Sequence, residues 1–232
     1  MPALLAAALS FAGLHLLVSG TRVRDVLVAK LGAGPYRGLF SLATFGTLFA
    51  VTRTYKHAFA TDNHFYWVWP GAQHASAPIM LIALWLAVSG ITTKSPTAVG
   101  QEKLLAGDPE PRGVQHITRH PFLWGVSIWA TFHLAANGDA ASLVLFATFL
   151  IVAIAGTVSI DHKRERLLGD AWRRYAARTS NLPFAAMIQG RTRFSFRELG
   201  WARPLLTLLV FAVVVSLHPM LFHAYPMPGM ND

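Results

Sequence analysis

Six apolar segments divide this 232-residue chain, and each is long enough, or nearly so, to cross a membrane as an α-helix. Such a crossing needs about 20 helical residues. Charged residues make up only 13% of the sequence, whereas roughly 25% is usual in soluble domains. We therefore expect an all-α, polytopic membrane bundle. Its six expected spans are Pro2–Ser19, Gly38–Thr54, Ala75–Ile91, Pro121–Ala136, Ala140–Ile160 and Pro204–Phe222.

Local signals agree with these bounds. Pro121 and Pro204 open their segments, where the missing N–H of proline does no harm to a helix. Asn137-Gly138-Asp139 is typical of a tight turn, so spans four and five should form a helical hairpin. Residues 1–19 have no basic n-region and no convincing cleavage site, which favours a retained span over a signal peptide. We expect a single membrane domain over residues 1–232.

The basic residues predict the orientation. Eighteen of the 20 Lys and Arg residues lie in the loops after spans one, three and five, and only Arg53 and Lys56 fall on the other side. The positive-inside rule then places these loops in the cytoplasm and both termini outside. This orientation accounts for the net charge of +9 without nucleic acid. We expect a multi-pass protein of a bacterial inner membrane, with the lipid bilayer as its main partner.

Two further stretches should lie at the membrane surface. Residues 65–70, FYWVWP, read as an aromatic belt at the outer interface. Residues 161–200 form the longest cytoplasmic loop, which is basic, and its first part, Asp161–Tyr175, alternates charged residues with Leu, Trp and Tyr. That alternation predicts an amphipathic helix along the cytoplasmic interface.

Histidines are the candidate ligands, because the sequence contains no cysteine for disulfides, thiolate ligands or covalent haem attachment. His15, His133 and His218 lie inside expected spans, where an imidazole usually faces a site or a partner helix. A cofactor held by two histidines would need them on different helices. By depth alone, His57, His74 or His218 would pair with His133 more readily than His15 would.

A second kind of site is expected at Thr118-Arg119-His120-Pro121, where span four begins. The free N–H groups of a helix N-terminus attract anions, and the Arg119 guanidinium adds a fixed positive charge. Arg119 and His120 are therefore candidate catalytic residues. The structural alternative, without catalysis, is an interfacial arginine beside a histidine that caps the helix.

The order and spacing of these motifs resemble the NnrU family, bacterial membrane proteins that are associated with denitrification and related to plant zeta-carotene isomerase. The resemblance covers nearly the whole chain. It rests on His15 to Arg24, Arg37-Gly38-Leu39-Phe40, His57, Ile117 to Pro121, Ile128-Trp129 with His133, Asn181-Leu182-Pro183-Phe184 and Ser216-Leu217-His218-Pro219.

In its isomerase branch, this family implies a membrane-embedded haem b with two histidine ligands. Position by position, these fall on His15 and His133, which are thus also the implied metal ligands. A cysteine given as an alternative ligand in that branch corresponds to Ala130 here. The resemblance implies haem-dependent cis–trans isomerisation, or a role in nitrite and nitric oxide reduction, with a hydrophobic small molecule or a redox partner.

Two alternatives remain open. Arg119-His120-Pro121 followed by Glu165 resembles isoprenylcysteine methyltransferases, which implies S-adenosylmethionine as cofactor and Glu165 as a third catalytic residue. The chain departs from that pattern because Phe122, not Tyr, follows the proline and the acidic pair is reduced to Glu165. The other alternative is a non-enzymatic assembly factor whose basic cytoplasmic face binds a partner or anionic lipid.

Overall fold

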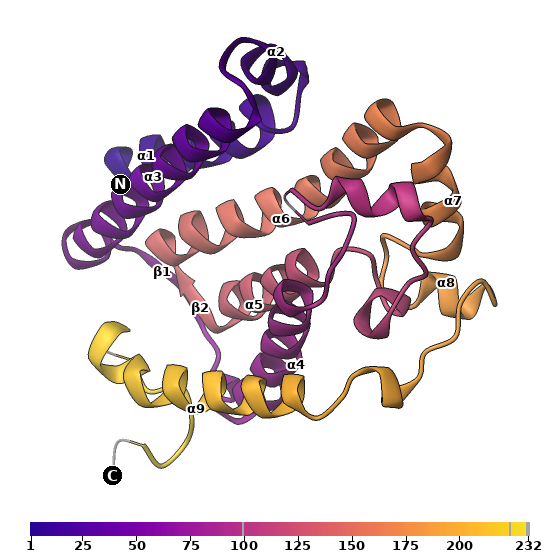
Figure 1. Ribbon diagram of the computed structural model, residues 1–232. Coiled ribbons are helices and arrows are strands. Elements are labelled where there is room, and N and C mark those ends of the chain that lie inside the picture. The colour runs from indigo at the N-terminus through magenta and orange to yellow at the C-terminus, as the bar shows by residue number, and fades with distance from the viewer. Residues whose placement is uncertain (99, 223, 231–232) are drawn as a thin grey trace. The chain divides into compact units, whose positions relative to one another are not determined.

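The structure, a computed structural model, describes residues 1–98, 100–222 and 224–230. It is mostly helical, as expected, with one short two-stranded ribbon (Figure 1). The chain divides into two compact units. The first comprises residues 1–69 and 130–159, and the second comprises residues 70–129 and 160–232. A single domain over residues 1–232 stays a prediction.

In the first unit, α1 (Pro2–Gly13) packs along α3 (Ala33–Thr61), and the two run side by side in Figure 1. The N-terminal part of α6 (Ala140–Leu168) completes the unit. Its core consists of buried apolar side chains from these three helices: Leu4, Phe11, Val51, Ala58 and Ala141. Burial of such side chains is the main source of stability that this unit shows.

The start of α1 and the end of α3 meet at one end of this unit. The amino group of Met1 forms an ion pair with Asp62 at 2.8 Å. Just beyond, β1 (Phe65–Val68) pairs antiparallel with β2 (Asn137–Asp139). Gly138 must be glycine there, because a Cβ atom would lie 2.2 Å from the carbonyl oxygen of Trp67. Residues 137–139, predicted as a tight turn, thus form the short strand β2, which connects α5 to α6.

The first expected span contains a break. After α1, residues Leu14–Val18 form the π-helix η1, and α2 (Arg22–Leu31) then leaves at 77° to the segment Pro2–Val18. The Thr21 side chain caps α2 by accepting a hydrogen bond from the Val23 N–H at 3.2 Å. The basic residues after span one thus lie on a helix, not on an irregular loop.

The second unit contains α4 (Ala72–Thr92), the first part of α5 (Pro121–Ala136), the C-terminal part of α6, α7 (Asp170–Arg178), α8 (Ala185–Ile188) and α9 (Ala202–Phe222). Three short 3₁₀ turns join them: η2 (Glu102–Gly107), η3 (Gly113–His116) and η4 (Phe196–Glu198). Helix α9 packs on α4 (Figure 1). Helices α4 and α5 cross closely at Gly125, where a Cβ atom would lie 2.5 Å from the Ala83 carbonyl oxygen.

Within the described residues, three helices are long and apolar enough to cross a membrane: α4, α6 and α9. The bent segment from Pro2 to Leu31 adds a fourth if it counts as one span. Spans three, five and six are thereby confirmed as long apolar helices. Helix α5 has only 16 residues, which gives about 24 Å against a hydrocarbon core of about 30 Å. The total of six spans and the outer position of the termini stay predictions.

The amphipathic stretch after span five differs from the predicted surface helix. Helix α6 continues to Leu168, and Gly169, with a φ of 50°, separates it from α7. Trp172 and Tyr175 of α7 are buried and pack with Leu105. The apolar face of α7 is therefore covered by protein from η2 and not by lipid.

Candidate functional site

The run from Thr118 to Pro121 is held in place by two other segments of the second unit. The Arg119 N–H donates to the Ser180 carbonyl at 2.9 Å, and the Thr118 hydroxyl donates to the Asn181 carbonyl at 2.6 Å. The Thr97 hydroxyl donates to the Arg119 carbonyl at 2.8 Å. Pro121 then starts α5. These contacts fix the backbone so that the next two side chains point the same way.

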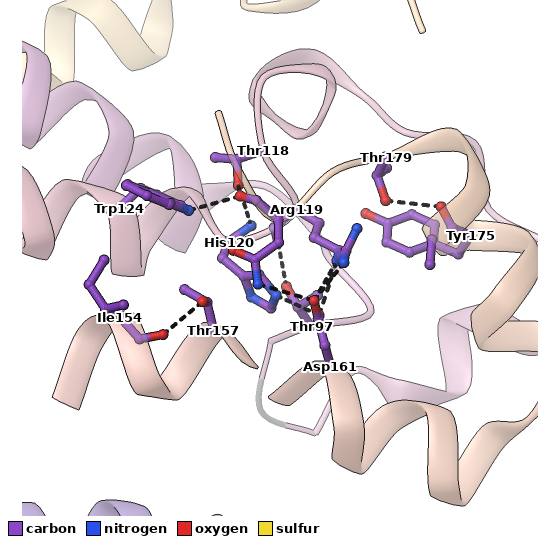
Figure 2. A network of polar contacts seen from close by, with 12 residues as sticks. Thr97, Thr118, Arg119, His120, Trp124, Ile154, Thr157, Asp161, Tyr175 and Thr179 are labelled. Carbon is purple, nitrogen blue, oxygen red and sulfur yellow. Dashed lines mark hydrogen bonds and ion pairs between the residues drawn. The ribbon is translucent and has the colours of Figure 1, made fainter. Parts of the chain in front are cut away.

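Those two side chains converge on one carboxylate, Asp161 of α6 (Figure 2). Arg119 donates to both of its oxygens, from Nε at 3.0 and 3.1 Å and from Nη2 at 2.5 Å. The Nε2 atom of His120 lies 2.7 Å from Oδ1, and Asn181 donates from Nδ2 to Oδ2 at 3.1 Å. Arg119 thus neutralises this carboxylate, and all three side chains orient it, an arrangement typical of strong charge-assisted hydrogen bonds.

Burial sets the protonation of this cluster. The exposed fraction of the His120 side chain is 1%, and those of Arg119 and Asp161 are 13% and 15%. Burial lowers the pKa of His120, with Asp161 acting in the opposite direction and Arg119 and Arg164 adding to the lowering. His120 is therefore neutral near pH 7. Its Nε2–H must be the donor, because both carboxylate oxygens of Asp161 accept from their neighbours.

A second layer holds the donors of this cluster. The Asn181 carbonyl accepts from both Thr118 and the Trp124 indole, the latter at 2.8 Å. Phe184, with a φ of 65°, donates its N–H to the Ile117 carbonyl at 2.8 Å. Through these hydrogen bonds, the segment from Asn181 to Phe184 holds Ile117 and Thr118, which precede α5, in position. The guanidinium of Arg119 also lies 5.6 Å from the centre of the Trp172 ring.

Of the three predicted catalytic residues, the structure brings two together. Arg119 and His120 share Asp161, whereas Glu165 lies one turn further along α6 with its side chain 52% exposed. Its neighbour is the equally exposed Arg173, at 3.8 Å. The carboxylate that Arg119 and His120 share is Asp161, which is not among the predicted catalytic residues. The available signal was that Asp161 is the first charge after the apolar run from residue 140 to 160.

The predicted cofactor ligands all lie in the first unit. His15 sits in η1, where its Nδ1 lies 2.8 Å from the Phe11 carbonyl oxygen and its ring lies 4.3 Å from that of Phe11. His133 sits near the end of α5, with its ring 4.7 Å from that of Phe146. His57 lies on α3 and is exposed. Two of these histidines can bind one iron only if they lie at similar depths along the helices of this unit.

The depths of His15 and His133 can be compared through the residues of α6 that lie level with each of them. His133 is level with Phe146 through their ring contact. At the other end, the Ser159 hydroxyl donates to the Gly20 carbonyl at 3.3 Å. His15 precedes Gly20 by five residues, which places it roughly level with residue 154. At 1.5 Å per residue, the eight residues between these two levels mean that His15 and His133 differ in depth by about 12 Å.

These positions do not fit a haem with His15 and His133 as its axial ligands. Metal–imidazole bonds are about 2 Å long, so two nitrogens across one iron lie about 4 Å apart. Between the two histidines, the ring of Phe11 packs on His15 and, at 5.3 Å, on Phe149. Phe149 follows Phe146 by three residues on the same face of α6. Phenyl rings thus pack against the imidazoles of both His15 and His133.

His57 does not supply the missing ligand. The Tyr55 hydroxyl contacts the Ser142 hydroxyl at 3.1 Å, so that face of α3 is turned toward α6. His57, two residues later, is rotated by about 200° and points away. Among the described residues, no group of three His, Asp or Glu side chains could hold a metal ion.

The second unit also contains one open pocket relevant to the methyltransferase alternative. It has a volume of about 380 Å³ and is lined by Lys94, Gly100, Gln101, Lys103 and Leu104. Two lysine side chains disfavour the sulfonium cation of S-adenosylmethionine. The residues that resemble the methyltransferase motif are meanwhile engaged with Asp161 or exposed. The described residues thus offer little support for that cofactor.

Comparison with known proteins gives a consistent family. A family model described as NnrU protein matches residues 3–226. The chloroplastic 15-cis-zeta-carotene isomerase of Zea mays is 31% identical over 81 residues, 35% of this chain and 22% of that protein. The same enzyme of Arabidopsis thaliana is 35% identical over 83 residues, 34% and 22% of the two chains. The match thus spans about a fifth of the length of these relatives. No solved structure matches the chain.

Proposed function

The chain belongs to the NnrU family, and from this we propose that it is a membrane enzyme that isomerises a double bond of a long apolar polyene between cis and trans. The reaction is the one named for the plant proteins that it resembles. The single observation that carries the proposal is the buried cluster of Arg119, His120 and Asp161. Buried, charge-coupled groups of this kind are concentrated at functional sites.

The cluster suits this chemistry through its fixed charge. Rotation about a double bond requires the π bond to weaken, and positive charge can then develop along the conjugated chain. An imidazole that Asp161 already holds in one orientation stabilises such charge through its dipole, without rearranging. Arg119 and Asn181 hold Asp161 in position, and the surrounding apolar side chains exclude water. No atom is gained or lost, so the reaction consumes no co-substrate.

The test is isomerisation by purified protein in lipid vesicles. Vesicles that contain wild-type protein and 15-cis-zeta-carotene should accumulate the trans isomer, as measured by chromatography, while protein-free vesicles should not. His120→Phe, which removes the imidazole but keeps a ring, should reduce the rate by at least tenfold. Equal conversion by this variant, or no conversion by well-folded wild-type protein, would contradict the proposal.

The membrane arrangement belongs to the same proposal. We expect six spans, both termini outside and the basic loops in the cytoplasm of a bacterial cell, with the protein in its inner membrane. The support is the uneven distribution of Lys and Arg and the presence of long apolar helices. The exposed aromatic run from Phe65 to Trp69 would then lie at the outer interface.

Haem b and a link to nitrite or nitric oxide reduction stay predictions from the family. If haem is bound, it would supply one-electron chemistry, but the arrangement of His15 and His133 does not hold it as expected. An optical spectrum of detergent-purified protein from iron-replete cells decides the point. A Soret band that is lost in His133→Ala would support His133 as a haem ligand. A colourless protein that is still active would show that the reaction does not need haem.

The two alternative functions have less support. For a methyltransferase, calorimetry with millimolar S-adenosylmethionine should give no binding heat, because Arg119 and His120 are occupied by Asp161. For an assembly factor, a defined complex should co-purify with the protein. No contact within the described residues favours either function over isomerisation.

A further inference from the structure

One polar group beside the Asp161 cluster has no role in the contacts described so far. The hydroxyl of Tyr175 is completely buried, and no hydrogen-bond partner for it lies within the described part of the chain. Burial raises the pKa of Tyr175, so its phenol keeps its proton and can only be satisfied by an acceptor or a donor nearby. A buried hydroxyl without a partner is rare in native proteins and calls for an explanation.

The position of this phenol is well defined. The Tyr175 ring lies 5.9 Å from the ring of Trp172, on which the Arg119 guanidinium also packs. The charges of Arg119 and Asp161 both act on the phenol, and Figure 2 shows the hydroxyl end of the ring turned toward Arg119. The orphan donor therefore faces the proposed site.

Nearby protein groups do not satisfy it. The Ser95 hydroxyl is close enough to lower the pKa of Tyr175, but no hydrogen bond of normal distance and angle joins the two hydroxyls. That hydroxyl is instead 2.8 Å from the hydroxyl of Thr97, which donates to the Arg119 carbonyl. The hydroxyls of Ser95, Thr97 and Tyr175 thus line one polar spot between α7 and the segment that precedes Arg119.

The segment that packs on this phenol also lines an open pocket. Leu105 packs on Tyr175, whereas the preceding Leu104 lines the open pocket of about 380 Å³. Gln101, which also lines that pocket, accepts a hydrogen bond from the Ser95 N–H at 2.8 Å. The segment that covers the phenol on one side therefore borders the pocket on the other.

We propose that Tyr175 donates a hydrogen bond to a neutral oxygen, a hydroxyl or a keto group, at one end of the otherwise apolar substrate. A neutral group fits because Arg119 is already neutralised by Asp161, so neither an anion nor a cation gains a free partner. The inference rests on the proposed function, since it names the class of polyene that the same site takes. A phenylalanine would fill the same space if packing were the only role of this residue.

The experiment compares two polyenes that differ by one hydroxyl. β-Carotene and β-cryptoxanthin are titrated into detergent-solubilised protein, and binding is read from quenching of tryptophan fluorescence. Wild-type protein should bind the hydroxylated polyene about three- to tenfold more tightly, which is the usual net effect of one neutral hydrogen bond. Tyr175→Phe should bind both equally, with an unchanged or slightly higher melting temperature.

Tyr36→Phe is the matched control, because Tyr36 is another buried tyrosine whose hydroxyl finds no partner among the described residues, and it lies in the first unit. This variant should keep the preference for β-cryptoxanthin. Equal binding of both polyenes by wild-type protein, or a preference that survives in Tyr175→Phe, overturns the inference. A binding preference without isomerisation would support the Tyr175 subsite and refute the proposed isomerase activity. Isomerisation without a binding preference would support the activity and refute the subsite. Binding of neither polyene would refute both.

Discussion

Asp161 is the residue on which the buried cluster depends, because it is the single acceptor shared by Arg119, His120 and Asn181. A buried carboxylate is costly unless it is paired and hydrogen-bonded. Here both oxygens are engaged, so the charge is compensated where water is scarce. Glu165, one turn away, has an exposed partner and contributes little by comparison.

We predict that Asp161→Asn lowers the free energy of unfolding by about 3 kcal/mol, because it leaves the Arg119 charge buried without its partner. Glu165→Gln, which removes a carboxylate from the same helix, should change it by less than about 0.5 kcal/mol. Unfolding in a mixed-detergent titration measures both. Similar losses in the two variants would show that the cluster has no special part in stability.

The stability should also depend on pH through His120. Burial lowers the pKa of His120 in the folded protein below its ordinary value, so the unfolded chain binds a proton that the folded protein does not. The stabilising effect is complete above about pH 6.5 and declines as the pH falls from there toward the lower, folded-state pKa. His120→Gln should flatten the melting temperature between pH 7 and pH 5 relative to wild-type protein. An equal slope in both proteins would contradict this assignment.

At the scale of elements, hydrophobic pattern predicts where helices lie but not where they stop. Spans three, five and six appear within α4, α6 and α9. Yet α6 runs on to Leu168, and the predicted surface helix is divided at Gly169. Helix ends follow from backbone conformation and capping, which apolar periodicity does not encode. The π-helical break at His15 likewise left no signal in the pattern.

The crossing of α4 and α5 gives a prediction at this scale. Gly125→Leu should lower the free energy of unfolding by about 1–3 kcal/mol, because even a Cβ atom would lie 2.5 Å from the Ala83 carbonyl oxygen. Gly46→Ala on α3 is the control, since a Cβ there meets nothing within 4 Å. That change should be neutral or stabilising by up to about 1 kcal/mol. Thermal melts in detergent distinguish the two, and a Gly125→Leu variant that melts like wild type would refute the close crossing.

For the whole molecule, composition was enough to predict a helical membrane protein, and motif order was enough to predict the family. The site was only half predictable. Arg119 and His120 stand in a recognisable motif, but Asp161 lies 41 residues beyond His120, and Asn181 lies 20 residues beyond Asp161. Both Asp161 and Glu165 face similar directions on α6. Only the packing of the loops decides which carboxylate is enclosed.

The orientation is testable because the chain has no cysteine of its own. Single cysteines can be placed at three exposed positions, Thr61, Lys103 and Gln189. In intact cells, an impermeant maleimide should label Thr61→Cys, while Lys103→Cys and Gln189→Cys should react only after permeabilisation. The reverse pattern would invert the proposed topology, and labelling of all three in intact cells would reject it.

The most direct test of the account is the isomerisation rate of Asp161→Asn beside that of Glu165→Gln, each measured in vesicles at a temperature where both proteins remain folded. Both variants remove one negative charge from α6, four residues apart. We predict a loss of at least about 100-fold in Asp161→Asn, the usual effect of removing a preorganised electrostatic group, and a change of less than twofold in Glu165→Gln. Equal rates in the two variants, or a loss confined to Glu165→Gln, would contradict the assignment of this cluster as the site.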